Sequence, residues 1–244
     1  MRLLCSLACA ALLSAGCASA PAGDPVEHDP WEAANRGLYG FNVGLDKIST
    51  KPVAKGYAKV IPGPVRRGVT NFSRNLTTPG SAINNFLQGK PASGVSELAR
   101  FFVNSTIGLG GLFDIASRSG VEARPEDFGQ TAAVWGIPPG PFVMLPFFGP
   151  RTLRDALTFP LDIAADPLRY HDDDTVRISL WLLRLIDVRA RLLPLEEMLK
   201  GSADPYVTVR ESYLQNRTFE IYDGDPPVED DDELYDEFLE EEDY

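Results

Sequence analysis

The side chains that most often carry out catalysis are scarce in this 244-residue chain, which has two histidines and three cysteines. His28 lies in a short polar segment, and His171 precedes three consecutive aspartates at 172–174. A serine hydrolase of the α/β class would need a Gly-x-Ser-x-Gly turn, and the sequence contains none. A lone histidine beside aspartates also lacks the His and Cys spacing of a metal centre. We therefore expect no catalytic residue, no metal site and no cofactor, and predict that the protein is not an enzyme.

Cys17 is the residue whose surroundings do predict chemistry. Residues 1–16 resemble a signal peptide, with Arg2 as the positive charge and an apolar run at 3–13 that is too short to span a bilayer. The Leu-Ser-Ala-Gly-Cys sequence at 13–17 is similar to a bacterial lipobox, in which the signal is cut before a cysteine that becomes acylated, although Ser14 stands where leucine is usual. A plain secretory signal with an incidental cysteine is the alternative. Because no aspartate follows Cys17, the pattern favours sorting to the outer membrane.

The net charge of −12 is concentrated at the C-terminal end of the chain. Residues 223–244 contain thirteen of the 35 acidic side chains and no Lys or Arg, so the rest is nearly neutral. A neutral body lacks the basic face of a nucleic-acid-binding protein, and we expect no nucleic-acid partner. The composition predicts a polar tether at 17–28 and a disordered acidic tail at 223–244.

Residues 128–150 form a stretch without any charged side chain. They are numerous enough for a membrane span, but they contain five prolines, four of them in the interior, and several glycines, and proline breaks a helix. Irregular apolar backbone at membrane depth is tolerated only where protein surrounds it or where it lines a cavity. The stretch is therefore either a core loop of a soluble domain or a protein-supported element in contact with lipid.

Elsewhere, apolar residues recur at helical spacing and predict an all-α fold. Asp29 and Pro30 are typical of a capped helix start, which an apolar stripe from Trp31 to Ile48 follows. Residues 104–113 are a second uncharged stretch, rich in small residues that let helices approach closely. Further helices are predicted for 65–76, for 79–88, from a cap at Ser93, for 174–193 (apolar nearly all round, hence buried in protein or in lipid) and for 204–215.

Many separated motifs of this chain resemble the MlaA/VacJ family of outer-membrane lipoproteins. The best matches are Asp-Pro-Trp-Glu-Ala-Ala-Asn-Arg at 29–36 and Asn-Phe-Leu-Gln-Gly at 85–89, with others at 41–42, 71–76, 100–104, 108–114, 127–131, 140–150, 154–155, 204–206 and 210–213. The resemblance covers about 29–217 and places the family domain at 29–222. It implies one ring-like helical domain with irregular Gly/Pro-rich apolar segments, associated with the membrane.

The resemblance also implies a function and partners. Such proteins lie on the periplasmic face of the outer membrane, associate with trimeric porins and pass misplaced phospholipids from the outer leaflet to a soluble periplasmic carrier of the Mla type. The expected function is therefore maintenance of outer-membrane lipid asymmetry by a lipid-anchored protein. A structural, porin-associated lipoprotein without transport activity is the main alternative, and a phospholipase is a weaker one because of the missing catalytic motifs.

Within the expected channel, we predict that aromatic and apolar side chains form the wall or gate, that three amides make polar contacts, and that Gly and Pro residues set the backbone shape. For each single aromatic residue, ordinary packing in the protein interior is the alternative. The wall candidates are Phe41, Trp135, Phe142, Leu145, Phe147 and Phe148; the amides are Asn42, Asn104 and Gln130; and the shaping residues are Gly136, Gly140, Pro141 and Pro146.

Overall fold

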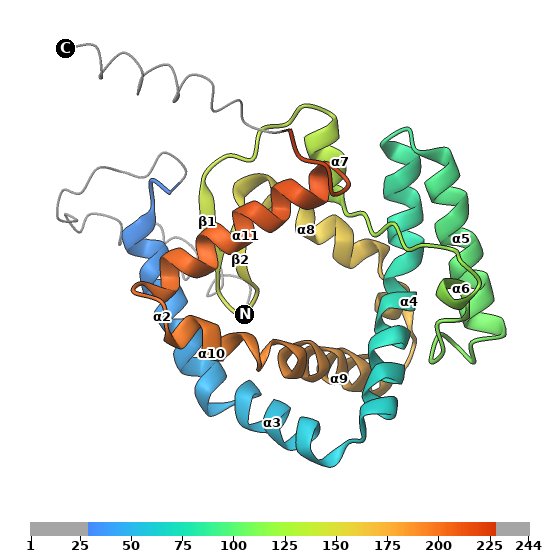
Figure 1. Cartoon of the computed structure of the whole chain (residues 1–244), viewed down its shortest axis with the longest axis horizontal. Helices are drawn as coiled ribbons and strands as arrows, with labels where there is room; N and C mark the ends of the chain where they lie inside the picture. Colours follow the sequence, from blue (N-terminus) through green and yellow to red (C-terminus); the bar gives the residue numbers. More distant parts are fainter. Residues whose placement is uncertain (1–28, 228–244) are drawn as a thin grey trace, which may run out of the picture.

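The computed structural model describes residues 29–227, which form a ring of helices around an opening (Figure 1). The signal at 1–16, Cys17, the tether and the tail from 228 onwards lie outside the described residues. The elements are α2 (Glu32–Ile48), α3 (Thr50–Val60), α4 (Gly63–Leu87), α5 (Pro91–Thr106), α6 (Ile115–Arg118), α7 (Phe128–Val134), β1 (Phe142–Leu145), β2 (Gly149–Thr152), α8 (Leu153–Ala165), the 3₁₀ turn η1 (Pro167–Tyr170), α9 (Asp174–Leu192), α10 (Leu195–Lys200) and α11 (Pro205–Ile221).

The path of the chain explains the ring shape. In Figure 1, α2, α3 and α4 follow one another around the outside, while α9 and α10 return along the inner side of α3. Helices α7, α8 and α11 and the hairpin β1–β2 close the remaining side, and α5 and α6 pack outside α4. The predicted all-α class is confirmed, with one small exception in the uncharged stretch at 128–150.

That exception is an antiparallel hairpin, although no strand was expected. After α7, the chain forms β1 and β2, with Phe142 opposite Thr152 and Leu145 opposite Gly149. Phe142 and Met144 are buried, whereas Val143 and Leu145 are half-buried. The stretch is thus neither a membrane span nor one irregular loop, but a short helix, a Gly/Pro turn and a hairpin.

Asp29 does not cap the first helix, which corrects the expected role of this residue. Helix α2 starts at Glu32 without a side-chain cap. The Asp29 carboxylate, 1% exposed, instead accepts hydrogen bonds from Asn35, from the Tyr206 hydroxyl and from Arg210. Pairing with a buried arginine stabilises a carboxylate more than an exposed cap does, because few solvent contacts compete there.

Two other expected boundaries were wrong. Helix α4 continues through Pro79 instead of dividing there, and after the proline its buried Ser81 and Asn85 bind the backbone of the segment before α7. Helix α5 starts at Pro91, two residues before the expected cap at Ser93, because proline fits the first helical position. Helix α3 had not been predicted at all.

Helix α11 closes the ring through two buried arginines. Arg210 donates to Asp29 at the start of α2, at 3.1 Å. Arg217 donates to Asp127, at the N-cap of α7, and to Asp155 in α8, over distances of 2.6 to 3.1 Å. These contacts join four segments that are far apart in the sequence.

The apolar core is small. Phe142, Met144 and Tyr206 form it, and side chains of α2 and α11 pack around them. Helix α9, predicted to be buried in protein or in lipid, leaves Ile178 and Trp181 about half exposed. Within residues 29–227, no helix combines the length and the apolar character needed to cross a membrane.

Candidate functional site

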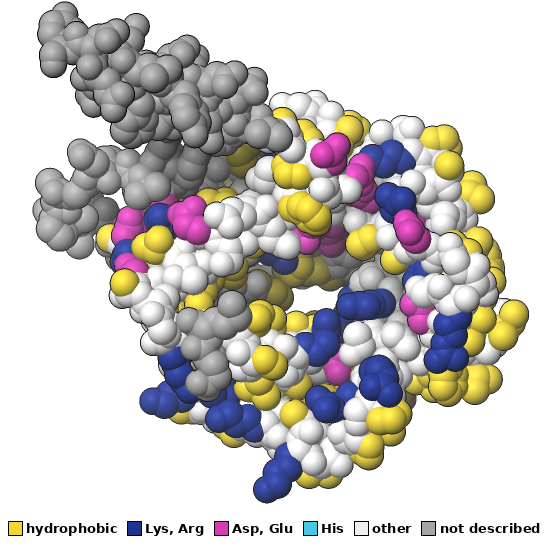
Figure 2. All heavy atoms as spheres, viewed as in Figure 1, with side chains coloured by type: hydrophobic (Ala, Val, Ile, Leu, Met, Phe, Trp, Pro, Cys, Tyr) yellow, Lys and Arg dark blue, Asp and Glu magenta, His cyan; other side chains and the backbone are white. Residues whose placement is uncertain are grey.

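An opening passes through the ring in the space-filling view, with basic side chains along part of its rim (Figure 2). A cavity of about 370 Å³ lies on the inner side of the ring between α4, α8 and α9. Most of the residues that line it are polar or charged, and the full set is Thr77, Gly80, Ser81, Asn84, Glu126, Asp127, Arg151, Phe159, Asp162, Ala165, Asp166 and Arg184.

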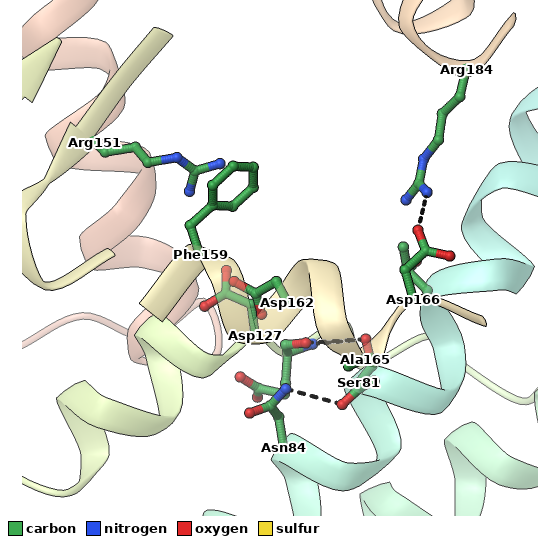
Figure 3. A pocket seen from close by; sticks show the side chains of 12 residues that line it. Ser81, Asn84, Asp127, Arg151, Phe159, Asp162, Ala165, Asp166 and Arg184 are labelled. Carbon is green, nitrogen blue, oxygen red and sulfur yellow. Dashed lines mark hydrogen bonds and ion pairs between the residues drawn. The ribbon is translucent and has the colours of Figure 1, made fainter. Parts of the chain in front are cut away.

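Two arginines reach this cavity from opposite sides (Figure 3). Arg151 extends from β2, and its guanidinium carbon lies 3.9 Å from the centre of the Phe159 ring. Its Nε is buried and makes no hydrogen bond to any described residue. Arg184 of α9 is different, because its guanidinium forms an ion pair with Asp166. Of these two arginines, Arg151 is therefore the one that forms no ion pair with a carboxylate of the described residues.

Asp162 of α8 lies between the two arginines (Figure 3). One of its oxygens accepts the backbone N–H of Phe128 at 3.0 Å. The pKa of Asp162 is raised to about 6, mainly by burial and also by the nearby Asp127, while the Phe128 hydrogen bond and the charges of Arg151 and Arg217 lower it. The cavity thus holds a half-buried carboxylate that feels the charges of Arg151 and Arg217 but forms no ion pair with a described residue.

A buried polar network supports the floor of the cavity. The Thr131 hydroxyl donates to Asn84 at 2.7 Å, and Gln88 donates to both Thr131 and Glu126. Lys90 pairs with the same Glu126 at 3.0 Å. These bonds tie the α4 face that carries Asn84 to Thr131 and Glu126 and restrict its rearrangement.

The amides Asn104 and Gln130, predicted to contact lipid, are both buried beside other protein groups. Asn104 donates to Asp114 and accepts the Ala116 N–H, so it holds the turn before α6. Gln130 hydrogen-bonds Glu126 at 2.7 Å when its Nε2 faces that carboxylate. Neither residue lines the cavity, and their contact with lipid stays a prediction.

The third amide, Asn42, joins the predicted gate residues at the hairpin. Asn42 of α2 donates to the Leu145 carbonyl and accepts the Phe147 N–H, both at 2.9 Å. The Phe41 and Phe147 rings meet edge to face with centroids 5.7 Å apart, and Phe147 is 69% exposed. The structure therefore brings these four residues together around the exposed hairpin tip, which also contains Pro146.

The remaining wall candidates are dispersed. Phe148 is half exposed and packs against Phe159, the ring that carries Arg151. Phe142 is completely buried in the core, so it packs against protein rather than facing the opening. Trp135 is 60% exposed and donates to the Leu87 carbonyl.

Apart from Pro146, which lies in the hairpin tip, the predicted shaping residues lie in the turn that leads into the hairpin. Gly136 and Gly140 both have positive φ angles, which suit glycine. The carbonyl of Pro141 accepts the Leu153 N–H at 2.9 Å. These residues therefore help to define how the hairpin leaves α7, and their role in a lipid channel stays a prediction.

Large apolar side chains are exposed in several places on the outside of the ring. The loop after α5 leaves Ile107 and Leu109 about two-thirds exposed, and Leu157 of α8 is 72% exposed. Figure 2 shows such side chains along the rim formed by α5 and α6. Apolar patches of this kind mark surfaces that contact another protein or a membrane.

Other chemistry has little support in the described residues. His171 lies in an exposed loop, where its Nδ1 accepts the Asp173 N–H at 3.2 Å. Within residues 29–227, no group of three or more His, Cys, Asp and Glu side chains could hold a metal ion.

The charged residues of the cavity were missed by the sequence reasoning. Arg151 is the first charged residue after the uncharged stretch, and Arg184 belongs to the narrow charged stripe of α9; both positions were available signals. Nothing in the sequence placed Asp162 beside them, because α8, β2 and α9 meet only in the folded chain.

Comparisons with known proteins agree on one family. The model of the MlaA lipoprotein family matches residues 27–220. The intermembrane phospholipid transport system lipoprotein MlaA of Shigella flexneri is 38% identical over 88% of this chain and 87% of its own, and its counterpart in Escherichia coli (strain K12) is 36% identical over the same shares. A solved structure, described as the structural basis for maintenance of bacterial outer membrane lipid asymmetry, aligns with a TM-score of 0.70 at 37% identity, covering 79% of this chain and 98% of that one.

Proposed function

Because this chain belongs to the MlaA lipoprotein family, we propose that it conducts phospholipids as part of a transport system between the two membranes of the cell envelope. More specifically, it removes phospholipids that have reached the outer leaflet of the outer membrane and releases them on the periplasmic side. It is anchored by the acylated Cys17, contacts a trimeric porin and hands its cargo to a soluble periplasmic carrier.

One observation supports this proposal: most residues that line the cavity are polar or charged, whereas many large apolar side chains of the ring are exposed. The cavity is lined by charged and hydroxyl groups, whereas Leu109, Leu157 and Phe147 are each exposed by 65% or more. A phospholipid has the same division, since its head group is charged and its acyl chains are apolar.

The proposed mechanism lowers the free energy that is needed to move a charged head group through the hydrocarbon of the membrane. A charge inside hydrocarbon is costly, so lipids change leaflets slowly without help. In the proposed path the head group passes along the polar opening, where Arg151 and Asp162 replace part of its hydration. The acyl chains stay in contact with apolar side chains at the hairpin tip and with the surrounding lipid. This is passive conduction, and no bond is formed or broken.

A narrowing of the opening tests the mechanism. Thr77 lines the cavity, is exposed and donates only to a carbonyl of its own helix, so Thr77→Trp should narrow the path without disturbing the buried network. Thr106→Trp is the matched control, because Thr106 has the same kind of bond but lies outside the cavity. Both variants, wild type and Cys17→Ala are expressed in cells that lack the gene, and outer-leaflet phospholipid is measured.

The expected result is excess outer-leaflet phospholipid in the deletion strain, corrected by wild type and by Thr106→Trp but not by Thr77→Trp or Cys17→Ala. Unchanged lipid asymmetry in the deletion strain would instead favour a structural envelope lipoprotein. Full correction by Thr77→Trp, at wild-type abundance, would rule out a path through this opening.

A further inference from the structure

We infer that the cavity is a subsite for a phosphoethanolamine head group, in which Arg151 binds the phosphate and Asp162 binds the ammonium group. The inference rests on the proposed function and adds a head-group preference to it. The cavity volume of about 370 Å³ lies within the range of small-ligand sites, roughly 300 to 1,000 Å³.

Arg151 is suited to bind the phosphate because its guanidinium is held against Phe159 and forms no ion pair with a described residue. Stacking on Phe159, 3.9 Å from the ring centre, holds the guanidinium plane and leaves its N–H edge available. No carboxylate of the described residues forms an ion pair with Arg151, whereas the Arg184 cation is paired with Asp166. A guanidinium held in this way matches the bidentate geometry of a phosphate group.

Asp162 is suited to the ammonium because the other acidic side chains of the cavity already have cationic partners. Asp127 is bound by Arg217, Glu126 by Lys90, and Asp166 by Arg184. The contact made by Asp162 is the Phe128 N–H, which leaves acceptor capacity on its carboxylate. A ligand ammonium would supply the missing positive charge.

The two groups occur in one hollow and face a shared space (Figure 3). A zwitterionic head group satisfies both. A glycerol head group offers a phosphate to Arg151 but leaves Asp162, a half-buried carboxylate, without a direct cationic partner. Unpaired buried charge is what a binding site uses to reject a close analogue. The arrangement therefore selects phosphatidylethanolamine over phosphatidylglycerol.

Calorimetric titration of the full-length protein in detergent micelles tests this selectivity. The probes are dihexanoyl phosphatidylethanolamine, dihexanoyl phosphatidylglycerol and free phosphoethanolamine. The variants are Asp162→Asn, which keeps an acceptor for the Phe128 N–H, Arg151→Gln, and Asp172→Asn, a control in an exposed loop outside the cavity. Thermal unfolding confirms that each variant folds.

We expect wild type and Asp172→Asn to bind the ethanolamine lipid about tenfold more tightly than the glycerol lipid, a difference of about 1.4 kcal/mol. Asp162→Asn should remove this preference, and Arg151→Gln should weaken the binding of both lipids to the same extent. Equal binding of both lipids by wild type, or an unchanged preference in Asp162→Asn, would overturn the inference.

The outcomes separate the inference from the proposed function. Free phosphoethanolamine should bind more weakly than the lipid, since it lacks acyl chains; equal binding would assign the cavity to a soluble phosphate ester instead. Equal binding of both lipids by wild type, together with wild-type correction of lipid asymmetry in cells, would overturn only the head-group preference, because the leaflet measurement tests conduction directly.

Discussion

Arg217→Met should destabilise the ring more than any exposed charge substitution. The Arg217 side chain is 8% exposed and donates to Asp155, which is 1% exposed, and to Asp127. Breaking a buried ion pair by removing one partner typically costs about 3 to 5 kcal/mol, because the remaining charge stays buried. Asp155 would keep the Tyr213 hydroxyl at 2.6 Å and Arg154 at 3.2 Å, so we expect the lower end, about 3 kcal/mol.

The measurement is thermal unfolding of the purified protein in one detergent, followed by circular dichroism. For a domain of about this size, 1 kcal/mol corresponds to roughly 2 to 4 °C, which gives a drop of about 6 to 12 °C. Arg177→Met is the control, since Arg177 forms an exposed pair with Asp174 that contributes about 0 to 1 kcal/mol. Equal melting temperatures for the two variants would refute the view that α11 closes the ring electrostatically.

The pH dependence provides an independent check. Burial raises the pKa of Asp155, but the attraction of Arg217 and hydrogen bonds outweigh it and leave that pKa below its usual value; the pKa of Asp127 is likewise lowered. A lowered folded-state pKa gives stability that is present above the unfolded value, about 3.9, and lost as the pH falls through the folded value. The penalty of Arg217→Met should therefore be large at pH 7 and shrink in acid.

Three further predictions follow from other parts of the ring. The pKa of Asp162 is raised to about 6 in the folded protein, so ionisation of this side chain above pH 6 destabilises the fold. Asp162→Asn should therefore melt at a higher temperature than wild type at pH 8 but not at pH 4. Gly111→Ala should lower the melting temperature more than Gly110→Ala. Both glycines have a positive φ, where a side chain costs about 1 to 2 kcal/mol. A Cβ at Gly111 would also lie 2.6 Å from the Cβ of Asn75, whereas no atom lies within 4 Å of a Cβ at Gly110. Phe147→Asp should leave protein abundance unchanged, since Phe147 is 69% exposed, yet raise outer-leaflet phospholipid; normal asymmetry would exclude this side chain from the lipid path.

Local sequence signals predicted most of the long helices, though not α3 or α8, and they missed the hairpin for a physical reason. The strands are only four residues long, and β2 contains a proline. What holds β1 are two amides of α2: Asn35 bonds the Phe142 carbonyl and the Met144 N–H, and Asn42 bonds the next pair along the strand. These contacts join residues more than 100 positions apart, beyond the reach of any local pattern.

The same limit explains which site residues were found. Exposed aromatic residues at the hairpin tip were visible in the sequence because they interrupt a Gly/Pro-rich stretch. The cavity depends on Arg151, Asp162 and Arg184, which come from three elements and look like ordinary surface charges in isolation. Asp29 shows the opposite error. Its local sequence is typical of a helix cap, but in the folded chain its carboxylate pairs with Arg210, which is distant in the sequence.

The burial of polar rather than apolar side chains in the ring is explained if the outside of the ring contacts lipid instead of water. Of the largest completely buried side chains only Phe142 is apolar, and the others are amides, hydroxyls and carboxylates: Asn84, Asn85, Thr131, Thr152, Asp29, Asp155 and Asp187. Burial of apolar surface contributes about 25 cal/mol per Å², so a protein in water gains by turning such side chains inward. A protein bordered by acyl chains gains nothing from doing so, and paired polar groups are then free to determine the shape of the interior. On the proposed function, the interior that results is also the one that a charged head group requires.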